Sequence, residues 1–279
     1  MCCKLHIVPG LKDCANGMAV VASLLAREHA TARVVDLNYG LDVLNTCNAD
    51  EVWVHGMWLP QEWAVCRKVL CLGKRLVRMT HGSLSPVCLN NQSKWKKRLV
   101  SPVEKWILRR SNNIVATCEA EVGWIKEYLG DRYPRIEVMD MRRFFNLPKT
   151  ESEPLPKDRP LHLLYLGREH PLKGIEYLKS ALANLPNVEL QVVSNAVGVE
   201  KDDAWHWCDC LVLPTLSENF GLVIAEALEH GKRVITTDGA PAWGDGNDYG
   251  GRLFYLKGYR DGTNETRVSL LRDAIEQLL

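Results

Sequence analysis

The feature that most constrains the fold is a regular alternation of short, apolar, β-rich runs with longer helical stretches. Alternation of this kind predicts a mostly parallel sheet covered by helices on both faces, since a parallel crossover normally runs through a helix. Over the first half, strands are predicted at Leu5–Val8, Arg33–Leu37, Glu51–His55, Arg75–Thr80, Asn113–Thr117 and Arg135–Met139. Helices are predicted around Ala19–His29, Glu62–Leu70, Trp95–Arg110 and Ala120–Leu129.

The alternation is interrupted over residues 147–160, where four prolines stand among charged residues. Proline lacks the N–H that a sheet ladder needs, so this stretch predicts a linker. Alternation then resumes with strands at Leu161–Leu166, Val188–Ser194, Cys210–Pro214 and Arg233–Thr237, and helices at Gly174–Asn184, Gly221–His230 and Val268–Leu279. The predicted fold class is therefore α/β, with Rossmann-like domains at 1–150 and 151–279 and ligands at the carboxyl ends of the strands.

Charge supports the same division. Residues 1–150 hold 22 Lys and Arg against 14 Asp and Glu, a net +8, whereas residues 151–279 hold 13 against 20, a net −7. The basic half is the one expected to meet phosphate, nucleic acid or an anionic membrane. No apolar run approaches the ~18–20 residues that span a bilayer, and the first residues lack the apolar core of a signal peptide, so a cytoplasmic protein is expected.

Two kinds of ligand chemistry find little support. Neither opening strand is followed by the GxGxxG turn of nicotinamide-dependent dehydrogenases. Most of the ten cysteines are scattered, and Cys208 and Cys210 have only His206 nearby as a further ligand, so no metal site and no cofactor are expected.

The densest chemical signal is the segment that runs from Pro214 to Leu228. An apolar strand ends at a proline, crosses a polar turn and enters a helix near Gly221, whose free N–H groups and positive dipole end suit an anion. Glu218 precedes this helix and Glu226 lies between one and two turns inside it. Glu226 stands in an otherwise apolar run, where a charge needs a partner or a ligand.

This segment resembles the E-x7-E motif of retaining glycosyltransferases with the GT-B fold, in particular glycosyltransferase family 4. The resemblance covers most of residues 161–245. It includes an upstream strand with a Gly-Arg and a Lys-Gly pair (Gly167-Arg168, Lys173-Gly174) and a downstream strand and turn over residues 231–241.

The resemblance implies roles for individual residues of the donor half. Arg168 and Lys173 would bind the diphosphate of a nucleotide sugar, together with backbone N–H groups of Phe220, Gly221, Leu222 and Val223. Glu226 would hold the ribose hydroxyls and Glu218 those of the donor sugar, and the loop at Asn195 would frame the base. The cations and the helix terminus could neutralise the leaving diphosphate without a metal ion.

The first half resembles the same family more loosely. Asn16-Gly17 matches a loop that faces the ligand cleft, although Asn16 could equally be a plain N-cap. Thr80-His81-Gly82 follows a predicted strand and resembles the family's His-Gly, in which the histidine contacts the transferred sugar. His55 ends a second strand in the same way and is a weaker candidate, since a lone histidine is more often structural.

The segment Lys94–Arg110 is basic and carries two tryptophans. It could be a solvated helical face, with two helices broken at Pro102, or an interfacial patch for an anionic membrane or a lipid-diphosphate-linked acceptor. Nucleic acid is not an expected partner, because no binding motif accompanies the charge.

The chain departs from the family pattern at two places. Asp140-Met141-Arg142-Arg143 replaces the usual Asn-Gly pair after the sixth strand. The family's C-terminal return helix has no counterpart after Val268–Leu279, so it would be absent, or replaced by oligomeric contacts.

The predicted function is retaining transfer of a hexose or N-acetylhexosamine, from a nucleotide sugar that is expected to be uridine-linked. The acceptor would be a hydroxyl of a glycan or lipid-linked saccharide, as in cell-surface polysaccharide or lipopolysaccharide synthesis. The alternatives are a non-catalytic subunit that supports a partner transferase and an unrelated two-domain ligand-binding protein.

Overall fold

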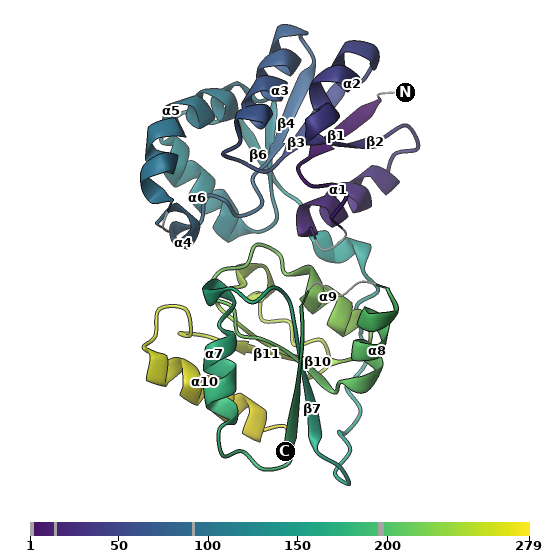
Figure 1. Ribbon diagram of the computed structural model, residues 1–279, viewed down its shortest axis with the longest axis vertical. Coiled ribbons are helices and arrows are strands. Elements are labelled where there is room, and N and C mark those ends of the chain that lie inside the picture. The colour runs from purple at the N-terminus through teal and green to yellow at the C-terminus, as the bar shows by residue number, and fades with distance from the viewer. Residues whose placement is uncertain (1–2, 14–15, 91–92, 195–197) are drawn as a thin grey trace. The chain divides into compact units, whose positions relative to one another are not determined.

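The chain forms two compact units, residues 1–140 and 141–279. The computed structural model describes residues 3–13, 16–90, 93–194 and 198–279. Each unit has one parallel sheet with helices on both sides (Figure 1), which confirms the α/β class with two Rossmann-like units. Residues 141–150, assigned from the sequence to the first domain, pack with the second unit.

The first unit contains a sheet in the order β2-β1-β3-β4-β5-β6. Its strands are Lys4–Val8 (β1), Arg33–Asp36 (β2), Glu51–His55 (β3), Arg75–Met79 (β4), Asn113–Ala116 (β5) and Arg135–Val138 (β6). Its helices are Gly17–Arg27 (α1), Gly40–Thr46 (α2), Pro60–Cys71 (α3), Pro86–Leu89 (α4), Lys94–Arg110 (α5) and Glu119–Leu129 (α6). All six predicted strands are present, whereas the short helices α2 and α4 were not predicted.

The two faces of this sheet follow from the alternation of side chains along each strand. In β1, Leu5 and Ile7 belong to the core that packs with α2 and α3. Val8, of opposite parity, packs against Ala19 and Ala22 of α1. His6 therefore lies on the α1 face of the sheet.

The second unit has a sheet in the order β11-β10-β9-β7-β8. Its strands are Leu161–Leu166 (β7), Val188–Val193 (β8), Cys210–Leu213 (β9), Arg233–Thr237 (β10) and Leu253–Leu256 (β11). Its helices are Ile175–Leu182 (α7), Val199–Trp207 (α8), Leu222–Glu229 (α9) and Asn264–Glu276 (α10). Helices α7 and α10 cover one face and share a core with β7, β9 and β10, while α8 and α9 lie on the other face (Figure 1).

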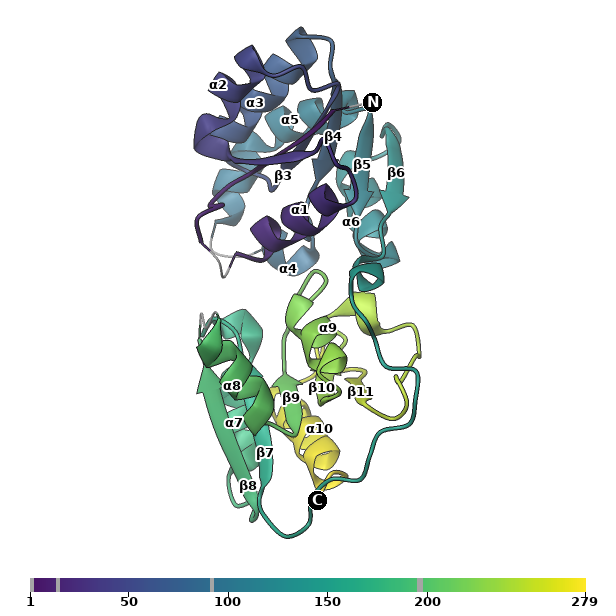
Figure 2. The same ribbon diagram turned by 90° about the vertical axis from the view of Figure 1, so that its right-hand side faces the viewer.

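The predicted linker is bound along the second unit (Figure 2). The backbone N–H of Ser152 donates to the carbonyl of Gly250 (2.8 Å), and the Arg252 guanidinium donates to the carbonyls of Thr150 (2.5 Å) and Glu151 (3.2 Å). The prolines keep this segment out of the sheet because proline has no backbone N–H to donate. The carbonyl groups of the segment can still accept hydrogen bonds from Arg252.

The helix predicted at Trp95–Arg110 is confirmed: α5 is one helix from Lys94 to Arg110 with Pro102 inside it, so the alternative of two helices broken at Pro102 is wrong. Pro102 is exposed, so water can satisfy the carbonyl that loses its helical partner. Within the described parts of the chain, no helix is long and apolar enough to cross a membrane.

Candidate functional site

The site is built where β7 and β9 lie side by side at the centre of the second sheet. The chain leaves β7 for β8 on one side, whereas β9 pairs with β7 on the other, so the loops after β7 and β9 diverge at this point. Such a switch point is the usual ligand site of an open parallel sheet.

The two loops are tied together by backbone contacts. The N–H of Leu216 donates to the carbonyl of Leu172 (2.8 Å), which also accepts from Oγ1 of Thr215 (3.1 Å). Gly174 adopts a left-handed φ of 68°, and a Cβ there would lie 2.1 Å from the carbonyl oxygen of Pro214. Only glycine permits this approach.

That contact brings Lys173 and Glu218 together. The ammonium of Lys173 forms an ion pair with the Glu218 carboxylate, and each side chain is 21% exposed. The backbone of Glu218 is held in place as well, because its N–H donates to the carbonyl of Gly239 (2.8 Å). The structure therefore places two of the predicted site residues in direct contact.

Arg168 follows the carboxyl end of β7, and its side chain is exposed. Its backbone is held by Tyr165, whose hydroxyl donates to the Arg168 carbonyl (3.0 Å). Among the described residues its guanidinium has no ion-pair partner, so this cation is available to an anionic ligand.

The start of α9 confirms the predicted helix entry. Gly221 is the N-cap with a left-handed φ of 74°, and Leu222 and Val223 open the helix, where amides lack intrahelical partners. Phe220 is buried against Trp243, whose indole N–H donates to the Phe220 carbonyl (2.5 Å). The helix start is thus held rigidly beside Glu218.

Glu226 has a partner that sequence reasoning missed. Its Oε2 lies 2.7 Å from the Nζ of Lys201, in the unpredicted helix α8. Helix α8 escaped prediction because few of its side chains are apolar, Ala204 and Trp205 being its buried residues. The sequence feature that indicated such a partner was the charge of Glu226 within an apolar run. Asn195 lies outside the described residues.

In the first unit, Asn16 is an N-cap. Its Oδ1 accepts from the N–H of Met18 (3.1 Å), and its Nδ2 donates to the carbonyl of Pro9 (2.6 Å). Gly17 is the first residue of α1. This loop follows β1 at the carboxyl edge of the sheet.

His81 stands in a loop that a buried carboxylate holds in place. One oxygen of Glu121 accepts from Oγ1 of Thr80 and the N–H of Gly82, both at 2.6 Å. The other accepts from the N–H and the hydroxyl of Thr117, after β5. His81 itself has a φ of 49°, which is uncommon outside glycine and is maintained by these flanking bonds.

His81 is the outer member of a row of three histidines. Its Nε2 lies 2.9 Å from Nδ1 of His55, and Nε2 of His55 lies 3.1 Å from Nδ1 of His6. His6 and His55 are fully buried, while His81 is partly exposed. Sequence reasoning ranked His55 low and missed His6. The strand order β1-β3-β4 and its register would have been needed to find the row.

Burial is the first cause of lowered pKa values along this row. The pKa of His81 falls to about 3, with Arg78 adding to the effect, and that of His6 falls to about 4, with Lys4 as the next cause. The pKa of His55 is also well below its usual range. All three rings are therefore neutral at physiological pH.

Comparison with known sequences links part of the second unit to a family. Residues 154–257 match the sequence model of the family described as glycosyl transferases group 1. An uncharacterised 41.2 kDa protein in the cps region of Klebsiella pneumoniae is 23% identical over 184 residues, which is 55% of this chain and 51% of that protein. The chain thus spans about half the length of this curated relative.

Solved structures resemble the chain over the length of both units. Sucrose-phosphate synthase from Thermosynechococcus elongatus matches with a TM-score of 0.69 at 13% identity, over 99% of this chain and 90% of that one. HepE of Anabaena, in complex with UDP and glucose, matches with a TM-score of 0.69 at 14% identity and the same coverage. These likenesses confirm the GT-B fold class.

Proposed function

We propose that the chain is a retaining glycosyltransferase that moves a hexose or N-acetylhexosamine from a UDP-sugar to a hydroxyl of a glycan or lipid-linked saccharide. The observation that carries the proposal is the contact of Lys173 with Glu218, beside Arg168 and the start of α9. The match of residues 154–257 to glycosyl transferases group 1 and the UDP and glucose bound to HepE support the donor class.

The second unit would hold the donor. Departure of UDP develops negative charge on the diphosphate, which Arg168, Lys173 and the first amides of α9 stabilise. The Lys173–Glu218 pair is partly exposed, so an incoming donor can exchange it for two new contacts. The ammonium then turns to phosphate and the carboxylate to sugar hydroxyls, while Glu226 takes the ribose hydroxyls.

The first unit would serve the acceptor, with His81 giving a hydrogen bond to the transferred sugar. In this proposal the acceptor hydroxyl attacks from the same face that UDP leaves. The departing phosphate oxygen takes the hydroxyl proton as the glycosidic bond to UDP breaks and the new one forms. The configuration at the anomeric carbon is thereby retained.

The acceptor would be reached at an anionic membrane surface through α5. Trp95 (61% exposed), Leu99 (74%), Val103 and Trp106 form an apolar stripe along one side of this helix. At ~1.5 Å per residue the stripe is about 16 Å long. An exposed apolar stripe with basic neighbours is what an interfacial helix requires.

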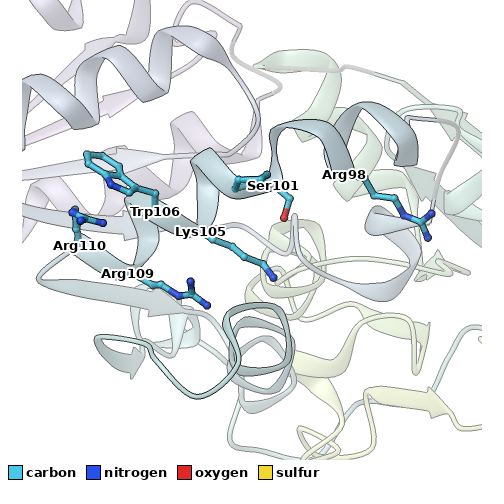
Figure 3. A pocket seen from close by; sticks show the side chains of 7 residues that line it. Arg98, Ser101, Lys105, Trp106, Arg109 and Arg110 are labelled. Atoms are coloured by element: carbon cyan, nitrogen blue, oxygen red, sulfur yellow. The ribbon is translucent and has the colours of Figure 1, made fainter.

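Basic side chains line a pocket of about 450 Å³ on the same helix. The side chains of Arg98, Lys105 and Arg109 extend from α5 and line this pocket together with those of Trp106 and Arg110 (Figure 3). The Arg110 guanidinium lies 4.3 Å from the Trp106 ring centre. Basic groups beside apolar ones match the phosphate and acyl layers of a lipid surface or of a lipid-diphosphate acceptor.

A donor panel tests the function. Purified wild type, Glu218→Ala and Arg168→Ala are given UDP-sugars, and release of UDP is measured with and without a glycan acceptor. Wild type should turn over one donor, and both variants should lose at least about a hundredfold in kcat/KM, as is usual when a group that stabilises developing charge is removed. Equal turnover in all three would refute the site. UDP binding without turnover would favour the non-catalytic subunit.

Metal independence is part of the proposal and is tested separately. Two cationic side chains beside a helix start can neutralise a diphosphate. The same assay in excess EDTA should retain its rate, and a loss that Mg²⁺ or Mn²⁺ restores would contradict this point alone.

A further inference from the structure

The three histidines come from neighbouring strands and point to the same face of the sheet. His6 pairs in register with Trp53 of β3, so His55, two residues further on, faces the same side. His55 pairs with Met79 of β4, and His81 again lies two residues further on. Each ring is thereby displaced toward the carboxyl edge, and the row runs from the interior to the surface.

Hydrogen-bond counting limits how the protons can be arranged in this row. A neutral imidazole carries one N–H and one acceptor nitrogen. Two hydrogen bonds join the three rings, so two protons lie within them and one is left at an end of the row. That end is either Nε2 of His6 or Nδ1 of His81.

The inner end is a poor place for the remaining proton. Nε2 of His6 is buried and has no hydrogen-bond partner among the described residues. Trp53 stacks on this ring with centroids 5.1 Å apart, and Lys4 is near enough for its charge to lower the pKa of His6. A buried N–H without an acceptor is costly, and a nearby cation makes it more so.

We propose that His6 and His55 are positioning residues that hold His81 as its Nδ1–H tautomer, so that His81 offers a hydrogen-bond donor to an oxygen of its ligand. The proton on Nδ1 of His6 is donated to Nε2 of His55. This places the His55 proton on Nδ1, from which it is donated to Nε2 of His81. Nδ1–H of His81 is then the free end.

The inference has a functional consequence that rests on the proposed transferase activity. A fixed N–H at the exposed end suits an oxygen lone pair of a sugar hydroxyl or phosphate. The hydrogen bond from His55 also sets the plane of the His81 ring. The left-handed backbone of His81 and the hydrogen bond from Gly82 to Glu121 fix where this side chain begins. The tautomer itself does not depend on the transferase activity.

Nitrogen NMR of the ¹⁵N-histidine-labelled full chain tests the tautomer without any substrate. The shifts of Nδ1 and Nε2 distinguish protonated from bare nitrogens, and His81→Gln identifies the His81 signals. Wild type is expected to show His81 protonated on Nδ1. An Nε2–H tautomer in wild type would overturn the inference, whatever the protein's activity.

Two variants at His55 separate hydrogen bonding from packing. His55→Phe keeps a ring but donates nothing, so His81 should move toward the Nε2–H form that free imidazole prefers in water. His55→Asn can place an amide N–H near the position of Nδ1 and should keep the wild-type tautomer. An unchanged His81 in a folded His55→Phe variant would also overturn the inference. Replacing the exposed His206 by Phe is the control and should leave the row unaltered.

If the donor panel identifies a substrate, kinetics adds a second readout. His55→Phe should lower kcat about tenfold, the scale of one hydrogen bond, with little change in KM for the donor, and His55→Asn should recover most of it. A loss confined to donor KM would count against positioning of His81. Absence of turnover in every protein would remove the proposed function but leave the NMR result standing.

Discussion

Oε2 of Glu226 lies 2.7 Å from the ammonium of Lys201, and this ion pair joins α9 to α8. Both side chains are about a quarter exposed. Lys201 therefore orients the carboxylate proposed to bind ribose while leaving it accessible.

Replacing Lys201 by Ala is expected to weaken UDP binding by a factor of about 1.4 to 5. This is the range for a partly exposed ion pair, typically about 0.2–1 kcal/mol. Isothermal titration calorimetry measures the change, with Lys179→Ala, on the exposed side of α7, as a charge-matched control. Equal affinity in the two variants would show that Lys201 does not support Glu226.

Replacing Gly174 by Ala should lower the free energy of unfolding by more than about 2 kcal/mol and abolish UDP binding. The new Cβ would lie 2.1 Å from the carbonyl oxygen of Pro214, so the loops after β7 and β9 must separate. Gly231→Ala is the matched control, since Gly231 has a φ of 70° and nothing lies within 4 Å of the position that its new methyl group would take. Urea unfolding should show a loss of only about 1 kcal/mol there. Similar losses in both variants would contradict the steric account.

The pH dependence of stability should reflect Glu62. This side chain is fully buried near Arg78 and Glu104, and burial raises its pKa from 4.5 to about 7. The folded chain therefore binds a proton that the unfolded chain releases between about pH 4.5 and 7. The contribution of Glu62 to stability is full below pH 4.5 and is lost as the pH rises through 7.

Glu62→Gln removes this titration and keeps the shape. At pH 8 the variant should exceed wild type in free energy of unfolding by up to about 3 kcal/mol, since each pKa unit corresponds to about 1.36 kcal/mol. At pH 5 the difference should be less than about 1 kcal/mol. Urea unfolding at both pH values checks this, and a difference that does not change with pH would contradict it.

Membrane contact through α5 is tested with vesicles. The wild type should sediment with vesicles rich in phosphatidylglycerol and not with neutral ones, because the helix combines an apolar stripe with basic groups. Leu99→Ala with Trp106→Ala should reduce binding about tenfold or more. Replacing the exposed Val199 of α8 by Ala is the matched control. Binding of wild type to neither vesicle would refute the membrane proposal.

The sequence by itself determined the order of strands and helices along most of the chain and the donor segment around Glu218. Both are local properties: apolar runs specify strands, and a proline, a polar turn and Gly221 specify a helix entry. Elements with little apolar periodicity, such as α8, could not be found this way. The sequence also did not show that the predicted linker is bound along the second unit, because Arg252, which donates to its carbonyls, is about a hundred residues away in the chain.

The tertiary structure alone decided which distant side chains meet. Lys173 reaches Glu218 because β7 and β9 are neighbours and Gly174 lets their loops touch. Lys201 reaches Glu226 because α8 and α9 cover the same face. The row of His6, His55 and His81 forms because β1, β3 and β4 are adjacent in the sheet. In each next strand the histidine lies two residues beyond the residue that pairs with the previous histidine. Strand order and register are set by packing of the whole sheet, so no local pattern in the sequence specifies these contacts.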